Sequence, residues 1–374
     1  MSLSPSPGES EPNGGRSERR SLLGLPRPEL ERAVAPLVDR TFRARQIYDA
    51  LYRRGVSRFA DMTDLSLELR GALEDRFEVA PPRAVLRERS ADGSSKALLE
   101  LADGATIEAV AIPDGRRMTL CLSSQAGCGL ACRFCVTGFW GAGRNLDSGE
   151  IVGQALALRE GVKPPFEGLN LVFMGMGEPL QNLDEVARSL EIFSEFISWR
   201  RITVSTAGVI PGIERMASWE RRPNLAVSLH APDDERRGRL MPINRTYPLD
   251  DLLAALKAYP LERGRKVTIE YLLVRDFNDA PGDADLLVER LAGLDCKVNL
   301  IPVNPDPVLG ARMVPPDPRV SESFRARLKQ RGCLATLRRR RGDDVSAACG
   351  QLRAPGRPPR GFRHSRWLAG VERG

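Results

Sequence analysis

A short apolar strand followed by a cysteine-rich loop organises this sequence: Met118-Thr-Leu-Cys-Leu-Ser-Ser-Gln-Ala-Gly-Cys128-Gly-Leu-Ala-Cys132-Arg-Phe-Cys135. Three closely spaced thiolates can bind a metal or an iron–sulfur cluster and leave one coordination position open, because a closed structural site uses four protein ligands. The spacing C-x3-C-x2-C therefore favours a [4Fe-4S] cluster with one iron free for a substrate. Zinc, with His230 as a fourth ligand, is the alternative.

Short apolar segments alternate with helical patterns on the carboxyl side of this loop. The strand candidates are 118–122, 169–174, 202–205, 225–229, 267–273 and 297–301, and the helix candidates between them are 150–159, 183–197, 211–219, 249–257 and 284–292. Six strands alternating with helices predict a parallel sheet in an α/β fold, either doubly wound or a partial barrel. In both architectures the ligand site lies at the carboxyl ends of the strands.

Polar and special residues follow the predicted strands, as a site at that edge requires. The set comprises Cys128, Gly177 and Glu178 in the turn Gly175-Met-Gly-Glu-Pro179, Ser205, Ser228, His230 and Asn304. The glycines of the turn allow backbone groups to approach a ligand closely, and its carboxylate suits the ammonium group of an amino acid. Asp147 and Glu150 have the spacing of a capping box, which predicts the start of the next helix.

The 374 residues divide into five predicted segments. Residues 1–21 form a disordered lead rich in Ser, Pro, Gly, Glu and Arg, and residues 22–80 form a helical accessory domain. Residues 81–117 form a short antiparallel sheet linker, 118–352 the barrel, and 353–374 a basic disordered tail. No signal peptide and no apolar run of about 18 residues is found, which predicts a cytoplasmic protein without a membrane partner.

Charge and cysteine usage narrow the class further. The chain has 56 Lys and Arg against 49 Asp and Glu, a net charge of +7. Six arginines and one glutamate in residues 353–374 supply +5 of this net charge, so the rest of the chain is close to neutral. Recognition of an anion such as RNA is therefore expected to rely on local patches such as residues 338–341. Seven cysteines, an odd number, favour metal or redox chemistry in a reducing compartment over structural disulfides.

Several sequence runs together resemble the RlmN/Cfr family of radical S-adenosylmethionine enzymes, which methylate adenine in RNA. The runs are Cys121–Cys128, Cys132–Cys135, Phe173–Leu180, Val204–Gly208, Val227–His230, Asn299–Asn304, Arg341–Leu352 and, in the helical region, Phe42–Tyr48. The resemblance covers about residues 22 to 352 and implies a partial (βα)6 barrel and an RNA-binding role for the helical domain of residues 22–80. It also implies one [4Fe-4S] cluster held by Cys128, Cys132 and Cys135. S-adenosylmethionine, two molecules per turnover, would contact Gly177, Glu178, Ser205, Ser228, Leu229, His230 and Asn304.

The resemblance also assigns three catalytic residues. Cys349 would carry the methyl group as S-methylcysteine, Cys121 would resolve a covalent protein–RNA adduct through a transient disulfide with Cys349, and Glu108 would accept the ring proton. Each has a plainer reading, since Cys121 also suits a buried core position, Cys349 a turn of small residues, and Glu108 a strand position that faces water. Cys296 and Cys333 belong to no motif and are predicted to pack.

The implied substrates are adenosine 2503 of 23S rRNA and adenosine 37 of tRNA, methylated at C2, with an electron-donor protein as a further partner. The helical domain and the segment around Cys349 favour this C2 branch of the family over the C8 branch. Outside the family, a zinc-holding RNA-binding protein without catalysis remains the alternative.

Overall fold

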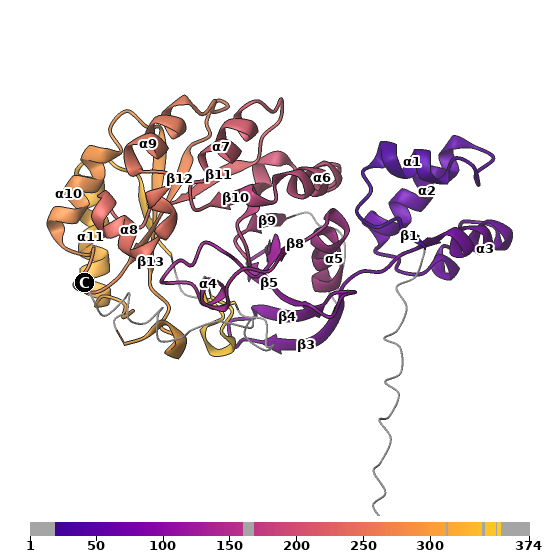
Figure 1. The fold of residues 1–374 in the computed structure, drawn as a ribbon, viewed down its shortest axis with the longest axis horizontal. Coiled ribbons are helices and arrows are strands. Elements are labelled where there is room, and N and C mark those ends of the chain that lie inside the picture. Colours follow the sequence, from indigo (N-terminus) through magenta and orange to yellow (C-terminus); the bar gives the residue numbers. More distant parts are fainter. Residues whose placement is uncertain (1–18, 160–167, 312, 339–340, 349, 353–374) are drawn as a thin grey trace, which may run out of the picture.

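The computed structural model describes residues 19–159, 168–311, 313–338, 341–348 and 350–352. It consists of a large sheet covered by helices and a smaller helical lobe at one end, which carries the first part of the chain (Figure 1). Within the described ranges, no helix is both long and apolar enough to cross a membrane.

A ten-stranded sheet forms the body of the protein, in the order β14-β13-β12-β11-β10-β9-β6-β5-β4-β3. Its parallel strands are β6 (Arg117–Cys121), β9 (Leu169–Phe173), β10 (Ile202–Thr206), β11 (Asn224–Ser228), β12 (Val267–Leu273), β13 (Cys296–Pro302) and β14 (Ala335–Leu337). The parallel strands follow one another in chain order without the reversal of a doubly wound sheet. The α/β partial barrel is therefore confirmed and the doubly wound alternative excluded.

Helices connect these strands and cover one face of the sheet (Figure 1). They are α5 (Ser148–Arg159), α6 (Leu183–Ser194), α7 (Ile210–Ala217), α8 (Asp234–Leu240), α9 (Leu249–Ala258), α10 (Pro281–Arg290) and α11 (Pro318–Gln330). The predicted capping box starts α5: the Glu150 amide donates to Asp147 at 2.7 Å, and the Asp147 amide donates to Glu150 at 3.0 Å. Helix α8 is absent from the helices predicted from the sequence.

Strand register separates an apolar outer face from a polar inner face. Leu171, Val204 and Ile269 alternate onto the side of the helices and are fully buried. Ser228 lies opposite Glu270, which in turn lies opposite Asn299, so this polar row crosses the other face. A closed barrel of this type fills its interior with branched apolar side chains. The polar interior here therefore marks the site.

The predicted antiparallel strands exist but do not form a sheet of their own. β3 (Arg83–Arg89), β4 (Ser95–Glu100) and β5 (Thr106–Asp114) form a meander, and β5 pairs with β6 of the barrel. The segment predicted as a linker is thus an extension of the barrel sheet. The physical reason is that this pairing satisfies the backbone groups at the edge of β6, which would otherwise remain open.

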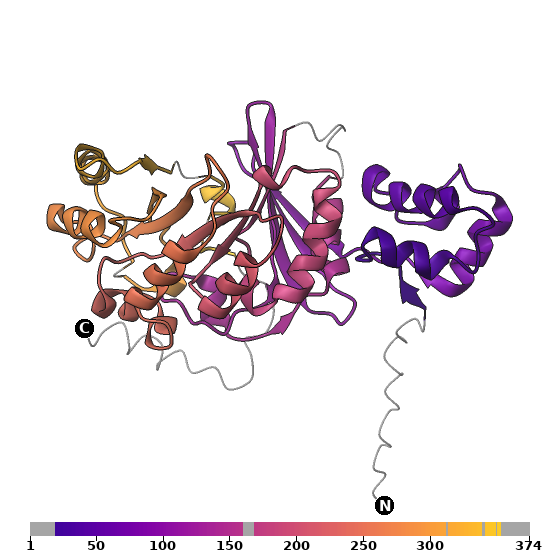
Figure 2. The same ribbon diagram turned by 90° about the horizontal axis from the view of Figure 1, so that it is seen from above.

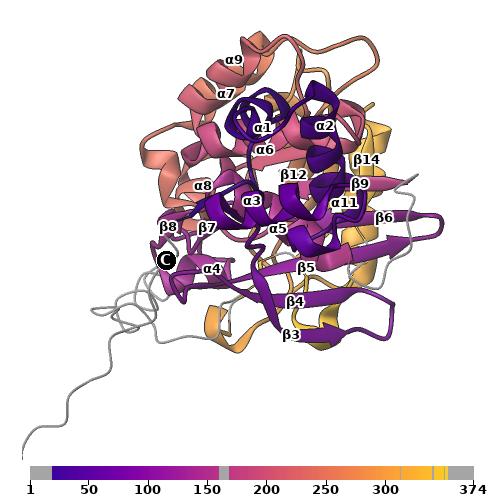
Figure 3. The ribbon, with the colours of Figure 1, turned by 90° about the vertical axis from the view of Figure 1, so that its right-hand side faces the viewer.

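The N-terminal lobe contains α1 (Arg27–Val34), α2 (Thr41–Asp49) with a π-helical turn after it, α3 (Leu67–Arg76) and the short parallel pair β1 (Arg20–Ser21) and β2 (Phe77–Glu78). Ordered structure therefore begins before the predicted boundary at residue 22, whereas residues 1–18 and 353–374 lie outside the described range. The lobe extends from the α5 and α6 side of the barrel (Figures 2 and 3). Arg188 of α6 forms an ion pair with Glu29 at 2.7 Å.

Candidate functional site

The cysteine loop is closed at its base by a short antiparallel ladder. β7 (Gln125–Ala126) pairs with β8 (Arg144–Asn145), and the Cys128 amide donates to the Gly141 carbonyl at 2.8 Å. Gly143 permits this closure, because a Cβ there would lie 1.5 Å from the carbonyl oxygen of Ala126. The loop carries one short helix, α4 (Val136–Trp140), which the sequence analysis did not predict.

The three thiols of this loop oppose one another's ionisation. Burial raises the pKa of Cys128 to about 12, and Cys135 and Glu178 add to the effect. Burial and the same neighbours hold the pKa of Cys132 well above its ordinary value, while the guanidinium of Arg237 lowers it. Thiolates crowded in this way need a compensating positive charge, which a bound metal centre supplies as the thiol protons leave. The donor set fits a thiolate-bound cluster.

Within the described ranges, no three His, Cys, Asp or Glu side chains already converge closely enough to hold a metal ion. The three thiols of Cys128, Cys132 and Cys135 nevertheless all line one cavity. Only Cys132 is buried, and the other two thiols are half-buried at the cavity wall, which leaves their side chains room to turn.

His230 follows β11 and is already engaged. Its Nδ1 accepts the Leu272 amide at 3.0 Å, and its ring packs edge-on against Phe134 with 4.6 Å between centroids. Burial, with a contribution from Arg237, lowers the pKa of His230 to about 3, so the ring is neutral. In a neutral ring whose Nδ1 accepts, the other nitrogen carries the proton and has no lone pair for a metal. This argues against His230 as a fourth ligand for zinc.

The turn after β9 brings a buried carboxylate to the same place. Glu178 is 3% exposed, and its carboxylate accepts the amides of Leu180 at 3.0 Å and Ala207 at 2.7 Å. Burial nevertheless raises the pKa of Glu178 above its ordinary value. The close approach that the turn's glycines allow is to the chain itself, since a Cβ on Gly177 would lie 2.5 Å from Gln125.

One cavity at the carboxyl ends of the strands collects most of the predicted residues. Its lining includes Cys128, Cys132, Cys135, Gly177, Glu178, Ser205, Ser228 and His230. Residues from the cysteine loop and from the ends of β9, β10 and β11 therefore meet around one space. This is the convergence that the polar residues after the strands predicted.

Two predicted contacts lie outside this lining. Leu229 is fully buried, and its amide donates to the Glu270 carbonyl at 3.0 Å. Asn304 is 6% exposed and follows β13 without being part of the cavity wall. Their assignment as contacts of S-adenosylmethionine rests on the resemblance alone.

Cys121 and Glu108 lie on the neighbouring strands β6 and β5, also outside this lining. Cys121 is 7% exposed and lies opposite Val110, and Glu108 precedes Val110 by two positions, so the two side chains share a face. The Glu108 side chain is 4% exposed and forms an ion pair with Lys96 at 3.0 Å. The reading of Glu108 as a glutamate that faces water is therefore wrong.

Two charged residues at the site escaped the sequence analysis. Glu270 on β12 lines the cavity and accepts a hydrogen bond from Asn299 Nδ2 at 2.7 Å. As the one charged residue of a mainly apolar strand, it could have been found from the sequence. Arg237 on α8 is fully buried and donates to Asn244 Oδ1 at 2.6 Å, to the Ala207 carbonyl at 2.8 Å and to the Ser228 carbonyl at 3.2 Å. Nothing in its surface-like helix sequence predicts this burial.

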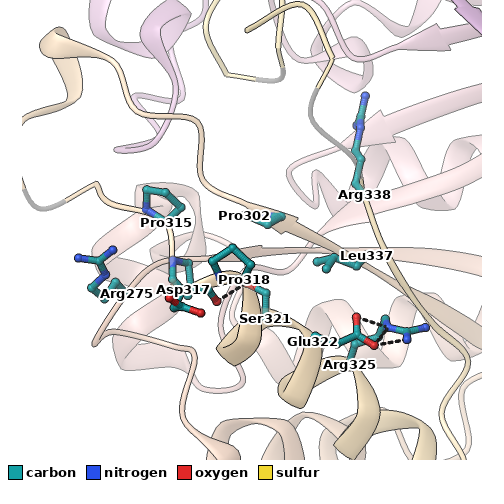
Figure 4. A pocket seen from close by; sticks show the side chains of 11 residues that line it. Arg275, Pro302, Pro315, Asp317, Pro318, Ser321, Glu322, Arg325, Leu337 and Arg338 are labelled. Atoms are coloured by element: carbon teal, nitrogen blue, oxygen red, sulfur yellow. Dashed lines mark hydrogen bonds and ion pairs between the residues drawn. The ribbon is translucent and has the colours of Figure 1, made fainter.

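A second cavity, of about 760 Å³, adjoins the first. Figure 4 shows its side chains: Pro302, Pro315 and Pro318 form rigid apolar walls, Arg275 lies at one side, and Arg338 extends away from the group. Arg338 also lines the cavity with the cysteines, so the two spaces share a wall. The volume is that of a small-molecule site.

Cys349 lies outside the described residues, but the chain on both sides of it is fixed. Before it, the Gly342 amide donates to Asp92 at 3.0 Å. After it, the Gly350 carbonyl accepts the Val136 amide of the cysteine loop at 2.7 Å, and Gly350 lines the cavity. The described residues contain no disulfide.

These features, a partial barrel with a three-cysteine loop after its first parallel strand, define a radical SAM protein. The Radical SAM superfamily matches residues 122–287, and the ribosomal RNA large subunit methyltransferase N-terminal domain matches residues 20–79. Proteins of this superfamily use S-adenosylmethionine and an iron–sulfur cluster.

Curated relatives specify the family. The dual-specificity RNA methyltransferases RlmN of Syntrophobacter fumaroxidans and Halorhodospira halophila are 45% and 46% identical, over 87% and 90% of this chain and 95% of each relative. A radical SAM methyltransferase from Sphaerobacter thermophilus has the same fold, with a TM-score of 0.85 and 42% identity over 90% of this chain and 99% of that one. The chain belongs to the RlmN family of RNA methyltransferases.

Proposed function

We propose that this protein methylates C2 of adenine in RNA through a methyl group carried on Cys349. The observation that supports this most is the single cavity at the carboxyl edge, where the three loop cysteines meet Glu178, Ser205 and Ser228. The segment that bears Cys349 contributes its next residue, Gly350, to the same wall. A methyl carrier there would be within reach of both the cofactor and the RNA base.

A radical route is required by the substrate. C2 of adenine is an electron-poor sp2 carbon and does not attack the methyl group of a sulfonium ion. Cys128, Cys132 and Cys135 would hold one [4Fe-4S] cluster, which would supply the electron for reductive cleavage of S-adenosylmethionine and so provide an acceptor for one hydrogen atom. Three thiol ligands would leave one position of the cluster open for the amino acid part of the cofactor.

The residues of the cavity bind and orient the cofactor. Glu178 is a buried carboxylate fixed by two backbone amides, which suits it to receive an ammonium group without moving. Ser205 and Ser228 offer hydroxyl groups at the ends of adjacent strands, and His230 offers a neutral ring. Leu229 and Asn304 complete the set that the family resemblance assigns.

The thiols and Glu108 then complete the transfer. Cys349 takes a methyl group by displacement from a first S-adenosylmethionine. Loss of one hydrogen atom from that methyl group, with a second S-adenosylmethionine, gives a methylene radical that adds to the ring carbon. Addition leaves one unpaired electron, which the cluster would take back as Glu108 accepts the ring proton. The Cys121 thiolate then attacks the Cys349 sulfur and breaks its bond to the methylene carbon, which takes up a proton as the methylated base leaves. The resulting disulfide must be reopened by a reductant.

The RNA substrates are adenosine 2503 of 23S rRNA and adenosine 37 of tRNA, and an electron-donor protein reduces the cluster. The proline-walled cavity beside Arg338 offers room for nucleotides that flank the adenine. Apolar walls suit the faces of bases, and the arginines suit phosphates.

Two cysteine variants test this function, with Cys296→Ala as the matched control because that thiol lies outside the cavity. Cys349→Ala should abolish methylation and retain the iron, since it removes the carrier and no cluster ligand. Cys121→Ala should trap RNA covalently on the protein, visible in a denaturing gel. Methylation by Cys349→Ala at the rate of the parent, or stoichiometric zinc without iron in anaerobically purified protein, would contradict the proposal.

A further inference from the structure

Lys96 is an ammonium group enclosed between two carboxylates. Its Nζ lies 3.0 Å from Glu108 Oε1 and 3.0 Å from Glu88 Oε2. The side chains of Lys96 and Glu108 are 6% and 4% exposed, whereas that of Glu88 is 39% exposed. The three groups therefore form a row from the interior of the protein to solvent.

Strand register places this row beside Cys121. Glu88 on β3 lies opposite Lys96 on β4, Lys96 lies opposite Val110 on β5, and Val110 lies opposite Cys121 on β6. Directly opposed residues share a face of the sheet, and Glu108 is on that face because it precedes Val110 by two. The described residues that this register brings together include two carboxylates, one ammonium and one thiol.

The backbone of Glu108 is also tied to the cofactor cavity. Ser123 Oγ donates to the Glu108 carbonyl at 2.6 Å and accepts the Met176 amide at 2.8 Å, and Met176 precedes the cavity residue Gly177. The Glu108 amide contacts the Met176 sulfur at 3.3 Å. Glu108 is thus held next to the site although its side chain is directed into the row.

The charge of the row decides its chemistry. A buried carboxylate paired with one ammonium is neutral as a unit and a weak base, because the pair would have to be broken for it to take a proton. Here a second carboxylate competes for the same ammonium, and the three groups together carry a charge of −1. The row can therefore take up one proton and become neutral.

We propose that Lys96 is a positioning residue that keeps Glu108 ionised and relays its proton to Glu88. The inference rests on the proposed function, because it assigns the route by which the ring proton leaves the site. Glu108 accepts the proton and becomes a carboxylic acid. Lys96 then gives one of its own protons to Glu88 and takes the proton of Glu108, so that Lys96 remains an ammonium, Glu108 is again a carboxylate, and Glu88 passes the proton to water.

Infrared spectroscopy tests the charge of Glu108 without any turnover. The full chain is labelled with [13C]glutamate, and the Glu108→Gln spectrum is subtracted at pH 7. The parent should show no carboxylic acid band from Glu108. Lys96→Met should show one, because a buried carboxylate without its cation protonates, and the band should be absent from the Lys96→Met, Glu108→Gln double variant.

Single-turnover kinetics test the relay. Lys96→Met should slow the decay of the covalent protein–RNA adduct by about 10²-fold, and Glu88→Gln by about tenfold, while adduct formation is unchanged. Lys96→Arg keeps the positive charge but cannot give up a proton, so Glu108 should stay ionised in its infrared spectrum while adduct decay stays slow. Glu100→Gln is the matched control, since Glu100 forms an ion pair with Arg83 across the same two strands at the surface, and should leave the rate unchanged.

The outcomes separate the two proposals. If the proposed function is wrong, the parent forms no covalent protein–RNA adduct. The infrared measurement still shows whether Lys96 keeps Glu108 ionised, because it needs no turnover. If Lys96→Met does not fold, Glu88→Gln and Lys96→Arg carry the test, because neither leaves a buried charge unpaired. An ionised Glu108 in Lys96→Met, or adduct decay at the parent's rate in both Lys96→Met and Glu88→Gln, would overturn the relay.

Discussion

Replacing Arg237 by methionine should weaken the barrel at the point where the site is built. Arg237 is fully buried and donates hydrogen bonds to Asn244 and to the carbonyls of Ala207 and Ser228. Ala207 directly follows β10, and Ser228 is the last residue of β11. Methionine has a similar length and no donor. The variant therefore leaves two backbone carbonyls without their partner and releases the two strand ends from each other.

The size of the effect follows from two opposed contributions. Hydrogen bonds from a charged donor contribute about 1.5–3 kcal/mol each, so three of them contribute roughly 6 kcal/mol. Burial lowers the pKa of Arg237 to about 10 from 12.5, which corresponds to a desolvation cost of about 3 kcal/mol that methionine avoids. The free energy of unfolding of the barrel should therefore fall by about 3 kcal/mol.

Guanidinium unfolding followed by tryptophan fluorescence in a Trp367→Phe background measures this loss in the barrel, because the other three tryptophans, Trp140, Trp199 and Trp219, lie there and none lies in the N-terminal lobe. Arg239→Met is the matched control on the same helix, since Arg239 is exposed and packs over Phe277. Arg239→Met should lower the free energy of unfolding by less than about 1 kcal/mol. Equal unfolding midpoints for the two variants would refute the role of Arg237.

Three further predictions concern the cysteine loop and the segment before Cys349. Alanine at any one of the three loop cysteines should abolish the iron–sulfur absorbance, which Cys296→Ala should retain. Gly143→Ala should reduce iron loading, because the new Cβ would clash with the backbone of Ala126 in β7. Gly282→Ala is the control and should leave iron loading unchanged, because the space around Gly282 is open. Bonds from Ser94 and Gly342 outweigh burial and lower the pKa of Asp92 to about 2, below its ordinary 3.8. The protection factor of the Gly342 amide in hydrogen exchange should thus be constant from about pH 8 to 5 and fall as the pH drops from about 4 to 2.

The parallel strands could be predicted from sequence because each is a short apolar run followed by a polar or glycine-rich turn. The same reasoning located the cavity, since carboxyl ends of parallel strands meet at one edge. It could not predict that β5 joins β6, because pairing between strands depends on which edges remain open in the fold.

Residues whose role depends on distant partners were also beyond the sequence. Lys96 and Glu108 are read singly as strand positions, and only the register brings the ammonium against the carboxylate. Arg237 lies in a run of charged residues typical of a solvated helix, and its burial follows from the packing of α8 under the strand ends.

Mass spectrometry of nucleosides from cells with and without this gene tests the central claim most directly. The 23S rRNA and the tRNA fraction are digested separately, and the isomers of methyladenosine are resolved by chromatography. We expect 2-methyladenosine in both fractions only when the gene is present, and its loss when the gene carries Cys349→Ala. Unchanged 2-methyladenosine in the absence of the gene, or 8-methyladenosine in its place, would contradict the account.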